Sequence, residues 1–392
     1  MDSPSCAVTS RPYYPLISVE TMTMTTADIV TYRLVNQRLI RSHFQKPDEV
    51  VTWLGAMQAQ EYAMAKWSIG LRSTGLTDAA VEAAFNDGAI LRTHLLRPTW
   101  HFVAPADIRW LLALTAPRVH GVNAFMYRKV ELNSAVFKRS NDTLVDALQG
   151  GKHLTRDQLK AALERVGIVA DGFRLAYLLM QAELDGLVCS GPRQGKQFTY
   201  ALLDERVPPT RPLDREAALA ELTRRYFASR GPATLQDFTG WSGLTMKDAK
   251  AGVAGLGPDF VQKRVDGQLY VFARTEFVAQ PRQEPTAYLL PDYDEYGISY
   301  KNRTAFFNPP AGLSESRDET IAYNRLLIIN GIAAGSWKRT LTRNAVEVDV
   351  ALFAPLDTIT REAVSNAIQQ YASFLGVAAA TPLELAKSQN AQ

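Results

Sequence analysis

The residues with the most specific chemical potential are two glutamines, Gln58 and Gln60, which flank Ala59 directly after an apolar segment. A glutamine side chain has an acceptor oxygen and two N–H donors, so a pair can orient a water or recognise a base edge without carrying charge. Residues two apart point to nearly opposite sides of a helix, so both face one ligand only in a turn, at a helix end or in distorted backbone. Taken alone, this spacing more often describes two exposed polar residues at a helix end.

Composition places the chain among ordinary globular proteins. It has 392 residues, of which 46% are hydrophobic and 21% charged, and a formal net charge of +3. That length is enough for two or three domains, and the mildly basic balance permits a nucleic-acid partner without requiring one. Cys6 and Cys189 form no CxxC or Cys/His pattern suited to a metal. We therefore expect a reduced, intracellular protein without metal or cofactor.

The first 24 residues lack a basic leading end and a continuous apolar run. Such a segment is neither a signal peptide nor a membrane span. We expect residues 1–24 to be a disordered tail, and the protein to be cytoplasmic with no membrane partner. Methionines at positions 22 and 24 offer later starts.

Residues 25–140 have the pattern of a winged helix-turn-helix. The segment contains helix starts at Thr25 and Pro47 and an amphipathic stretch over 78–87. β-forming residues follow over 90–103, where Pro98 must occupy an edge or turn. Helices followed by a two-stranded hairpin define this plan. Arg97, Thr99 and His101 then lie on or near the wing strands. For His101 a packed structural role is favoured over a catalytic one, because no carboxylate stands near it in the sequence.

The pattern recurs over residues 141–212 and 213–283. In the second unit Thr155 caps a helix, and strands over 187–189 and 197–202 flank a Gly/Pro turn with Arg193 and Lys196, which suits a wing tip that meets phosphate. In the third unit strands over 260–265 and 269–272 flank Asp266-Gly267, a strong hairpin signal. Three copies of this plan favour a DNA partner. Some copies could instead be protein–protein modules, since fold does not dictate function.

Residues 284–392 change character and are rich in β-forming residues, with an amphipathic helix over 360–374 and a frayed end beyond residue 385. They imply a small sheet or barrel. The predicted fold class is therefore α+β: three tandem winged helix-turn-helix domains followed by a small β-barrel or sheet domain.

Several motifs taken together resemble the bacterial winged-helix DNA glycosylase superfamily that contains AlkZ and YcaQ. The resemblance covers nearly everything after the tail and depends on the second wing and on Met57-Gln58-Ala59-Gln60, Arg97-Pro98-Thr99-Trp100-His101-Phe102-Val103, Leu290-Pro291-Asp292-Tyr293-Asp294-Glu295-Tyr296, Tyr300-Lys301-Asn302-Arg303 and Gly335-Ser336-Trp337. It implies a fold of three winged helices with a β-barrel. It also implies that the protein is associated with the nucleoid. It also implies a catalytic element of Gln, an aliphatic residue, then Gln in the AlkZ branch or Asp in the YcaQ branch.

The AlkZ branch is the one that Gln58 and Gln60 match, so the resemblance implies that these two residues are catalytic. Ala59 is a small version of the middle residue, and Pro98 stands where the family usually has a small residue. Thr99, His101 and Asp294 are candidate supporting residues, and Arg97, Arg193 and Lys196 are candidate DNA contacts. Asp294 is equally explained as a hydrogen-bonded turn residue beside Pro291.

The implied substrate is double-stranded DNA that contains alkylated purines. N7-alkylguanine and N3-alkyladenine carry a ring charge and leave without a strong acid, so two amides need only place water at C1′. No lysine nucleophile is required, and we expect a monomeric, monofunctional glycosylase. Base flipping is the general route to a base, but bulky or cross-linked adducts could be approached from outside the duplex. The alternative is a non-enzymatic transcriptional regulator, which would dimerise and prefer spaced half-sites.

Overall fold

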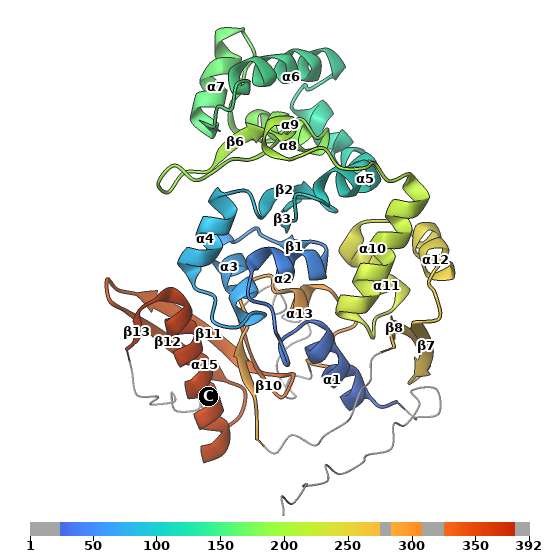
Figure 1. The fold of residues 1–392 in the computed structure, drawn as a ribbon, viewed down its shortest axis with the longest axis vertical. Helices are drawn as coiled ribbons and strands as arrows, with labels where there is room; N and C mark the ends of the chain where they lie inside the picture. Colours follow the sequence, from blue (N-terminus) through green and yellow to red (C-terminus); the bar gives the residue numbers. More distant parts are fainter. Residues whose placement is uncertain (1–23, 275–283, 308–324, 381–392) are drawn as a thin grey trace, which may run out of the picture.

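The computed structural model describes residues 24–274, 284–307 and 325–380, and it has a mixed α+β fold. Apart from Met24, the predicted N-terminal tail lies outside these residues, as do Cys6 and the predicted frayed end. The elements fall into four groups along the chain. Figure 1 shows them in one view with the longest axis vertical.

The first group contains four helices and a hairpin. Its elements are α1 (Thr26–Asn36), α2 (Pro47–Leu54), β1 (Met57–Gln58), α3 (Tyr62–Leu71), α4 (Asp78–Asn86), β2 (Leu91–Leu95) and β3 (Thr99–Val103). The predicted hairpin is confirmed, with Pro98 in the turn between β2 and β3. The short strand β1 pairs with β3, which gives a three-stranded sheet of order β1-β3-β2.

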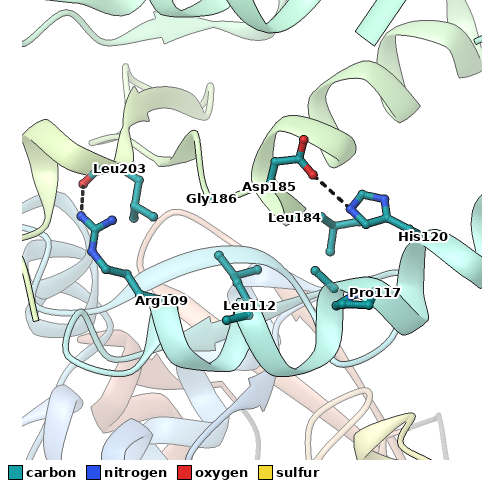
Figure 2. Close-up of a pocket in the computed structure, with 10 residues that line it drawn as sticks. Arg109, Leu112, Pro117, His120, Leu184, Asp185, Gly186 and Leu203 are labelled. Carbon is teal, nitrogen blue, oxygen red and sulfur yellow. Dashed lines mark hydrogen bonds and ion pairs between the residues drawn. The ribbon is translucent and has the colours of Figure 1, made fainter. Parts of the chain in front are cut away.

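Helix α5 (Ile108–Lys129) follows this sheet, and no helix was predicted over these residues. It runs between the first and second groups (Figure 1). Arg109 and Leu112 on α5 line a cavity of about 390 Å³ together with Leu184, Asp185 and Leu203 of the second group (Figure 2). His120 of α5 bonds Asp185 at 3.1 Å, so polar as well as apolar contacts join the two groups.

The second group lies at one end of the long axis (Figure 1). Its elements are α6 (Ser134–Leu148), β4 (Leu154–Thr155), α7 (Arg156–Arg165), α8 (Gly172–Leu184), β5 (Val188–Ser190), β6 (Thr199–Leu202) and α9 (Leu203–Arg206). Thr155 caps α7 as predicted, since its hydroxyl accepts a hydrogen bond from the backbone N–H of Gln158. A separate cluster of buried residues, including Leu144, Leu159 and Leu178, forms the core of this group.

The third group comprises α10 (Arg215–Arg230), α11 (Leu235–Ser242), α12 (Met246–Ala254), β7 (Phe260–Val265) and β8 (Gln268–Ala273). Asp266 and Gly267 connect β7 to β8 with φ values of 48° and 78°. Those left-handed conformations are what a tight hairpin turn requires, and the predicted hairpin is confirmed.

The C-terminal group contains β9 (Ala287–Leu289), α13 (Glu295–Ile298), β10 (Leu326–Ile329), β11 (Ile332–Leu341), β12 (Ala345–Leu352), α15 (Thr358–Leu375) and β13 (Ala378–Ala379). The strands form a five-stranded sheet of order β13-β12-β11-β10-β9. Of the predicted barrel or sheet, the described strands form an open sheet, since β13 and β9 at its two edges do not pair with each other.

One large core joins the first, third and C-terminal groups. Trp67, Trp241 and Trp337, one from each of these groups, are at most 2% exposed and belong to the same cluster. The indole of Trp67 donates to the carbonyl of Leu289 at 2.7 Å, which ties α3 to the C-terminal sheet. In the described part of the chain no helix is long and apolar enough to cross a bilayer.

Candidate active site around Gln58 and Gln60

The two glutamines lie on and just after strand β1. Helix α2 ends at Gly55, whose φ of 74° reverses the chain, and Gln58 then pairs with His101 of β3. Pairing continues one residue further, because the Ala59 N–H donates to the carbonyl of Trp100 at 2.7 Å. Ala59 is fully buried, and Gln60 lies in a bend directly after the strand. The pair is thus carried by extended and bent backbone, a setting in which residues two apart can face one ligand.

The backbone of this segment is held by a buried carboxylate. Glu295 on α13 accepts the Gln58 N–H at 2.9 Å and is bonded by Arg230 at 2.7 Å, and neither charged side chain is more than 1% exposed. Arg230 also donates to the carbonyls of Leu54 and Ala56. Burial alone raises the pKa of Glu295, but the charge of Arg230 and the Gln58 N–H outweigh it and lower that pKa to about 2. Glu295 is thus ionised, and it fixes the position of Gln58.

The side chain of Gln58 is held by an arginine. Arg97, in the turn before β3, donates to Gln58 Oε1 at 2.9 Å and to the carbonyls of Gly240 and Trp241 on α11. The sequence assigned Arg97 to DNA, whereas the structure places its guanidinium against the glutamine. A carbonyl oxygen has two lone pairs, so Oε1 retains one for another donor.

The two amides differ in accessibility. Gln58 is half-buried and Gln60 is exposed. Gln60 makes no side-chain hydrogen bond to the residues that the structure describes, and Gln58 makes only the one from Arg97. Both amides can therefore be reached by water, and one of them is pre-oriented.

His101 is the cross-strand neighbour of Gln58 and is fully buried. Its Nδ1 lies 2.9 Å from the carbonyl of Thr99, which requires a proton on Nδ1. Burial first, and then the charge of Arg97, lower the pKa of His101 to about 3, although Glu295 acts in the opposite direction. His101 is thus neutral at pH 7 and packed within the sheet, and the carboxylate that influences it comes from a distant part of the chain.

Thr99 and Asp294 have different surroundings. The hydroxyl of Thr99 is buried and has no hydrogen-bond partner among the described residues. Asp294 is 3% exposed and forms a two-pronged ion pair with Arg72, with both N···O distances 2.8 Å. It also accepts from the Ser68 hydroxyl and caps α13 through the Tyr296 N–H. Its oxygens are therefore occupied by the protein itself, which makes Asp294 a scaffold residue of α13.

Arg193 and Lys196 lie in the connection between β5 and β6. Arg193 is partly buried: its guanidinium lies 5.0 Å from the ring centre of Tyr62 and 4.3 Å from that of Phe198, and it donates to the Lys196 carbonyl. Lys196 is exposed, and its amine has no ion-pair partner among the described residues. Only Lys196 is thus presented to solvent in the way that a phosphate contact needs.

The structure adds two residues that were not among the predicted site residues. Glu295 stood inside a quoted motif without a role, and Arg230 ends α10 with no local sign of its function. Glu295 directly follows Asp294 in the sequence, so nothing local marks it as the buried partner of Arg230. Among the described residues, no three His, Cys, Asp or Glu side chains are grouped to hold a metal ion.

The combination of this fold with the paired glutamines defines a class. The family model of the AlkZ-like DNA glycosylases matches residues 51–374, and the chain belongs to that family. A curated relative, the interstrand DNA cross-link repair glycosylase of Streptomyces sahachiroi, is 23% identical over 253 residues, which cover 61% of this chain and 67% of the relative. The solved structure of Streptomyces sahachiroi DNA glycosylase AlkZ has a TM-score of 0.73 and 18% identity, and covers 91% of this chain and 98% of that one. That likeness shows a common fold.

Proposed function

We propose that this protein is a monofunctional DNA glycosylase that hydrolyses the N-glycosidic bond of cationic alkylpurines. Its substrates would be N7-alkylguanine and N3-alkyladenine in double-stranded DNA, including bulky and cross-linked adducts, and it would act as a monomer. The observation that carries the proposal is the pair of accessible, uncharged amides two residues apart at the end of β1, one of them oriented by Arg97. The cross-link substrate is suggested by the name of the Streptomyces sahachiroi relative.

The proposed reaction is an attack of water on C1′. The oxygen of Gln60 and the second lone pair of Gln58 Oε1 accept hydrogen bonds from the water and hold it in place. As the C1′–O bond forms, the C1′–N bond breaks, and its electron pair neutralises the charged ring of the departing base. The spare proton of the water passes to solvent. Positioning of this kind contributes several kcal/mol.

The neighbouring ionisable groups support selectivity for bases that leave the sugar without being protonated by the enzyme. Glu295 is ionised and buried, and His101 is neutral with a pKa of about 3, so neither supplies a proton to a leaving base at pH 7. An uncharged purine needs such a proton, whereas a cationic alkylpurine does not. We therefore expect slow or no release of normal bases.

The three helix groups that end in hairpins are interpreted as three winged helix-turn-helix units, with boundaries near residues 140, 212 and 283. They would grip the DNA mainly through its backbone, with strong salt dependence. A regulator without chemistry remains the less favoured alternative, because the family to which the chain belongs is one of glycosylases.

The test is release of free base from a duplex that contains N7-methylguanine. We expect Gln60→Ala and Gln58→Ala each to slow release by about 100-fold, as for the loss of a group that acts on the transition state. Gln369→Ala, on the exposed face of α15, is the matched control and should match the wild type. Release that both substitutions leave unchanged would refute this mechanism, and no release from methyl or bulky N7 adducts would favour the regulator.

A further inference from the structure

A second site lies between the first hairpin and the second group of helices. It is a cavity of about 300 Å³ whose wall includes three aromatic rings, Trp100, Phe198 and Tyr200, and three cations, Arg92, Arg156 and Lys196. Asp157 is the one acidic residue among those that line it. Apolar rings beside positive charge suit a nucleotide, because the base fills the apolar part of the cavity while the phosphate pairs with the cations.

Arg92 is the feature that most directly indicates a ligand. It is 7% exposed, and its Nε donates to the carbonyl of Ala59 at 3.0 Å. Its guanidinium lies 4.1 Å from the ring centre of Trp100 and 4.6 Å from that of Phe198. The two terminal nitrogens find no hydrogen-bond acceptor among the described residues. Burial lowers the pKa of Arg92 to about 10, so it is still a cation at pH 7 and has free donors.

Strand register separates this cavity from the glutamines. Cross-strand partners share a face of a sheet, so Gln58 shares a face with His101 and with Thr93 beyond it. Trp100 is paired with His94 instead, and Arg92 lies on the same face two residues earlier in β2. The cavity therefore opens on the face opposite to Gln58, and the base under attack is not its occupant.

We propose that this cavity binds a second nucleotide, one that is unstacked from the DNA near the lesion. Its base lies beside Trp100 and accepts hydrogen bonds from the free terminal nitrogens of Arg92, and its phosphate lies at Arg156 and Lys196. This site rests on the proposed function, since it describes how a glycosylase of this shape grips damaged DNA. Holding an unpaired neighbour would keep the duplex open at the lesion while the glutamines act on the other face.

The probe is an undamaged duplex that carries one 2-aminopurine in a single-nucleotide bulge. Adding the full-length protein should change the fluorescence of the bulged base saturably, whereas the same base in a fully paired duplex should not respond. Arg92→Lys keeps a buried cation but removes the forked terminal nitrogens, and should weaken binding of the bulged duplex at least about fivefold, the low end for a two-pronged arginine–base contact. Lys152→Met, an exposed lysine of the same group that does not line the cavity, should bind as the wild type does.

The result that would overturn the proposal is equal affinity for bulged and paired duplexes, or a folded Arg92→Lys variant that binds as tightly as the wild type. Should Arg92→Lys fail to fold, an Arg156→Met/Lys196→Met double variant is measured with the same two duplexes, and wild-type binding by it would also overturn the proposal. Gln60→Ala should bind the bulged probe normally. The assay uses undamaged DNA and measures no base release. The protein can therefore bind the bulged probe even if it releases no base, and it can release a base even if it does not bind the bulged probe.

Discussion

The two faces of the β1-β3-β2 sheet are built in opposite ways. On the face of Gln58 and His101, the buried charges are paired: Glu295 is bonded to Arg230, and Arg97 is held by backbone carbonyls. On the face of Trp100 and Arg92, His94 is bonded to the buried Glu183, but Arg92 retains free donors beside an open cavity. Groups that must be placed accurately for a reaction benefit from preorganisation by the protein itself, whereas contacts to a polyanion can be completed by the ligand. This contrast predicts which substitutions damage the fold, the rate or only the binding.

The largest effect is expected when the face of Gln58 and His101 loses its buried carboxylate, Glu295. Glu295→Gln leaves the buried charge of Arg230 without its counter-ion, and breaking such a pair costs about 3–5 kcal/mol. We expect that loss in the free energy of unfolding measured by urea denaturation. Glu347→Gln, an exposed glutamate on β12, should cost almost nothing. An equally small cost for both would mean that Glu295 does not anchor the site.

A second prediction separates positioning from DNA binding at Arg97. Arg97→Met removes the donor to Gln58 Oε1, and a displaced catalytic group can cost about 100-fold in rate. We expect base release at saturating DNA to slow by about that factor, while the affinity for DNA changes less than twofold. Arg361→Met, at the exposed start of α15, serves as control. Weaker DNA binding with an unchanged rate would instead restore the DNA-contact role that the sequence suggested.

Local signals explain which parts of this fold were predictable. The Asp266-Gly267 turn, the Thr155 cap and the hairpin around Pro98 each depend on residues a few positions apart, and each is confirmed. Helix α5 gave no such signal, because Pro117 and Gly121 interrupt the helical pattern inside it.

The candidate site was predictable only in part, because only some of its contacts are between residues close in sequence. The Gln58–Ala59–Gln60 spacing is local, but its strand geometry depends on pairing with β3. Glu295 bonds Gln58 across 237 positions of sequence, and Arg230 bonds Ala56 across 174. Long-range contacts of this kind leave no spacing pattern in one sequence, which is why the sequence did not indicate that Arg97 bonds Gln58 or that Glu295 anchors it.

A smaller effect is expected in how the stability of the protein depends on pH, and it comes from His101, on the same face as Gln58. The folded protein lowers the pKa of His101 from 6.5 to about 3, so the unfolded chain takes up the proton first. The stability that His101 contributes is complete above pH 6.5 and is lost as the pH falls toward 3. We expect roughly 1–2 kcal/mol of wild-type stability to disappear between pH 7 and 5 through this group.

His101→Asn should remove that part of the pH dependence, because asparagine does not titrate in this range. Glu295 does not interfere, since its lowered pKa confines its contribution to the range between about 4.5 and 2. His43→Asn, at an exposed histidine, should keep the wild-type slope. The measurement is the free energy of unfolding at several pH values, and a slope as steep in His101→Asn as in the wild type would contradict the neutral, buried assignment.

The smallest effect is expected in the connection between β5 and β6, which carries Arg193 and Lys196. Lys196 is exposed without an ion-pair partner among the described residues, whereas Arg193 is tied to the Lys196 carbonyl and lies against Tyr62 and Phe198. Each phosphate contact contributes about one unit to the slope of log affinity against log salt concentration. Lys196→Met should therefore reduce that slope by about one, and Arg193→Met by clearly less. Neither should change the rate of base release at saturating DNA, because both residues lie away from the amides; the opposite ranking would show that Arg193 leaves its aromatic neighbours to meet the DNA.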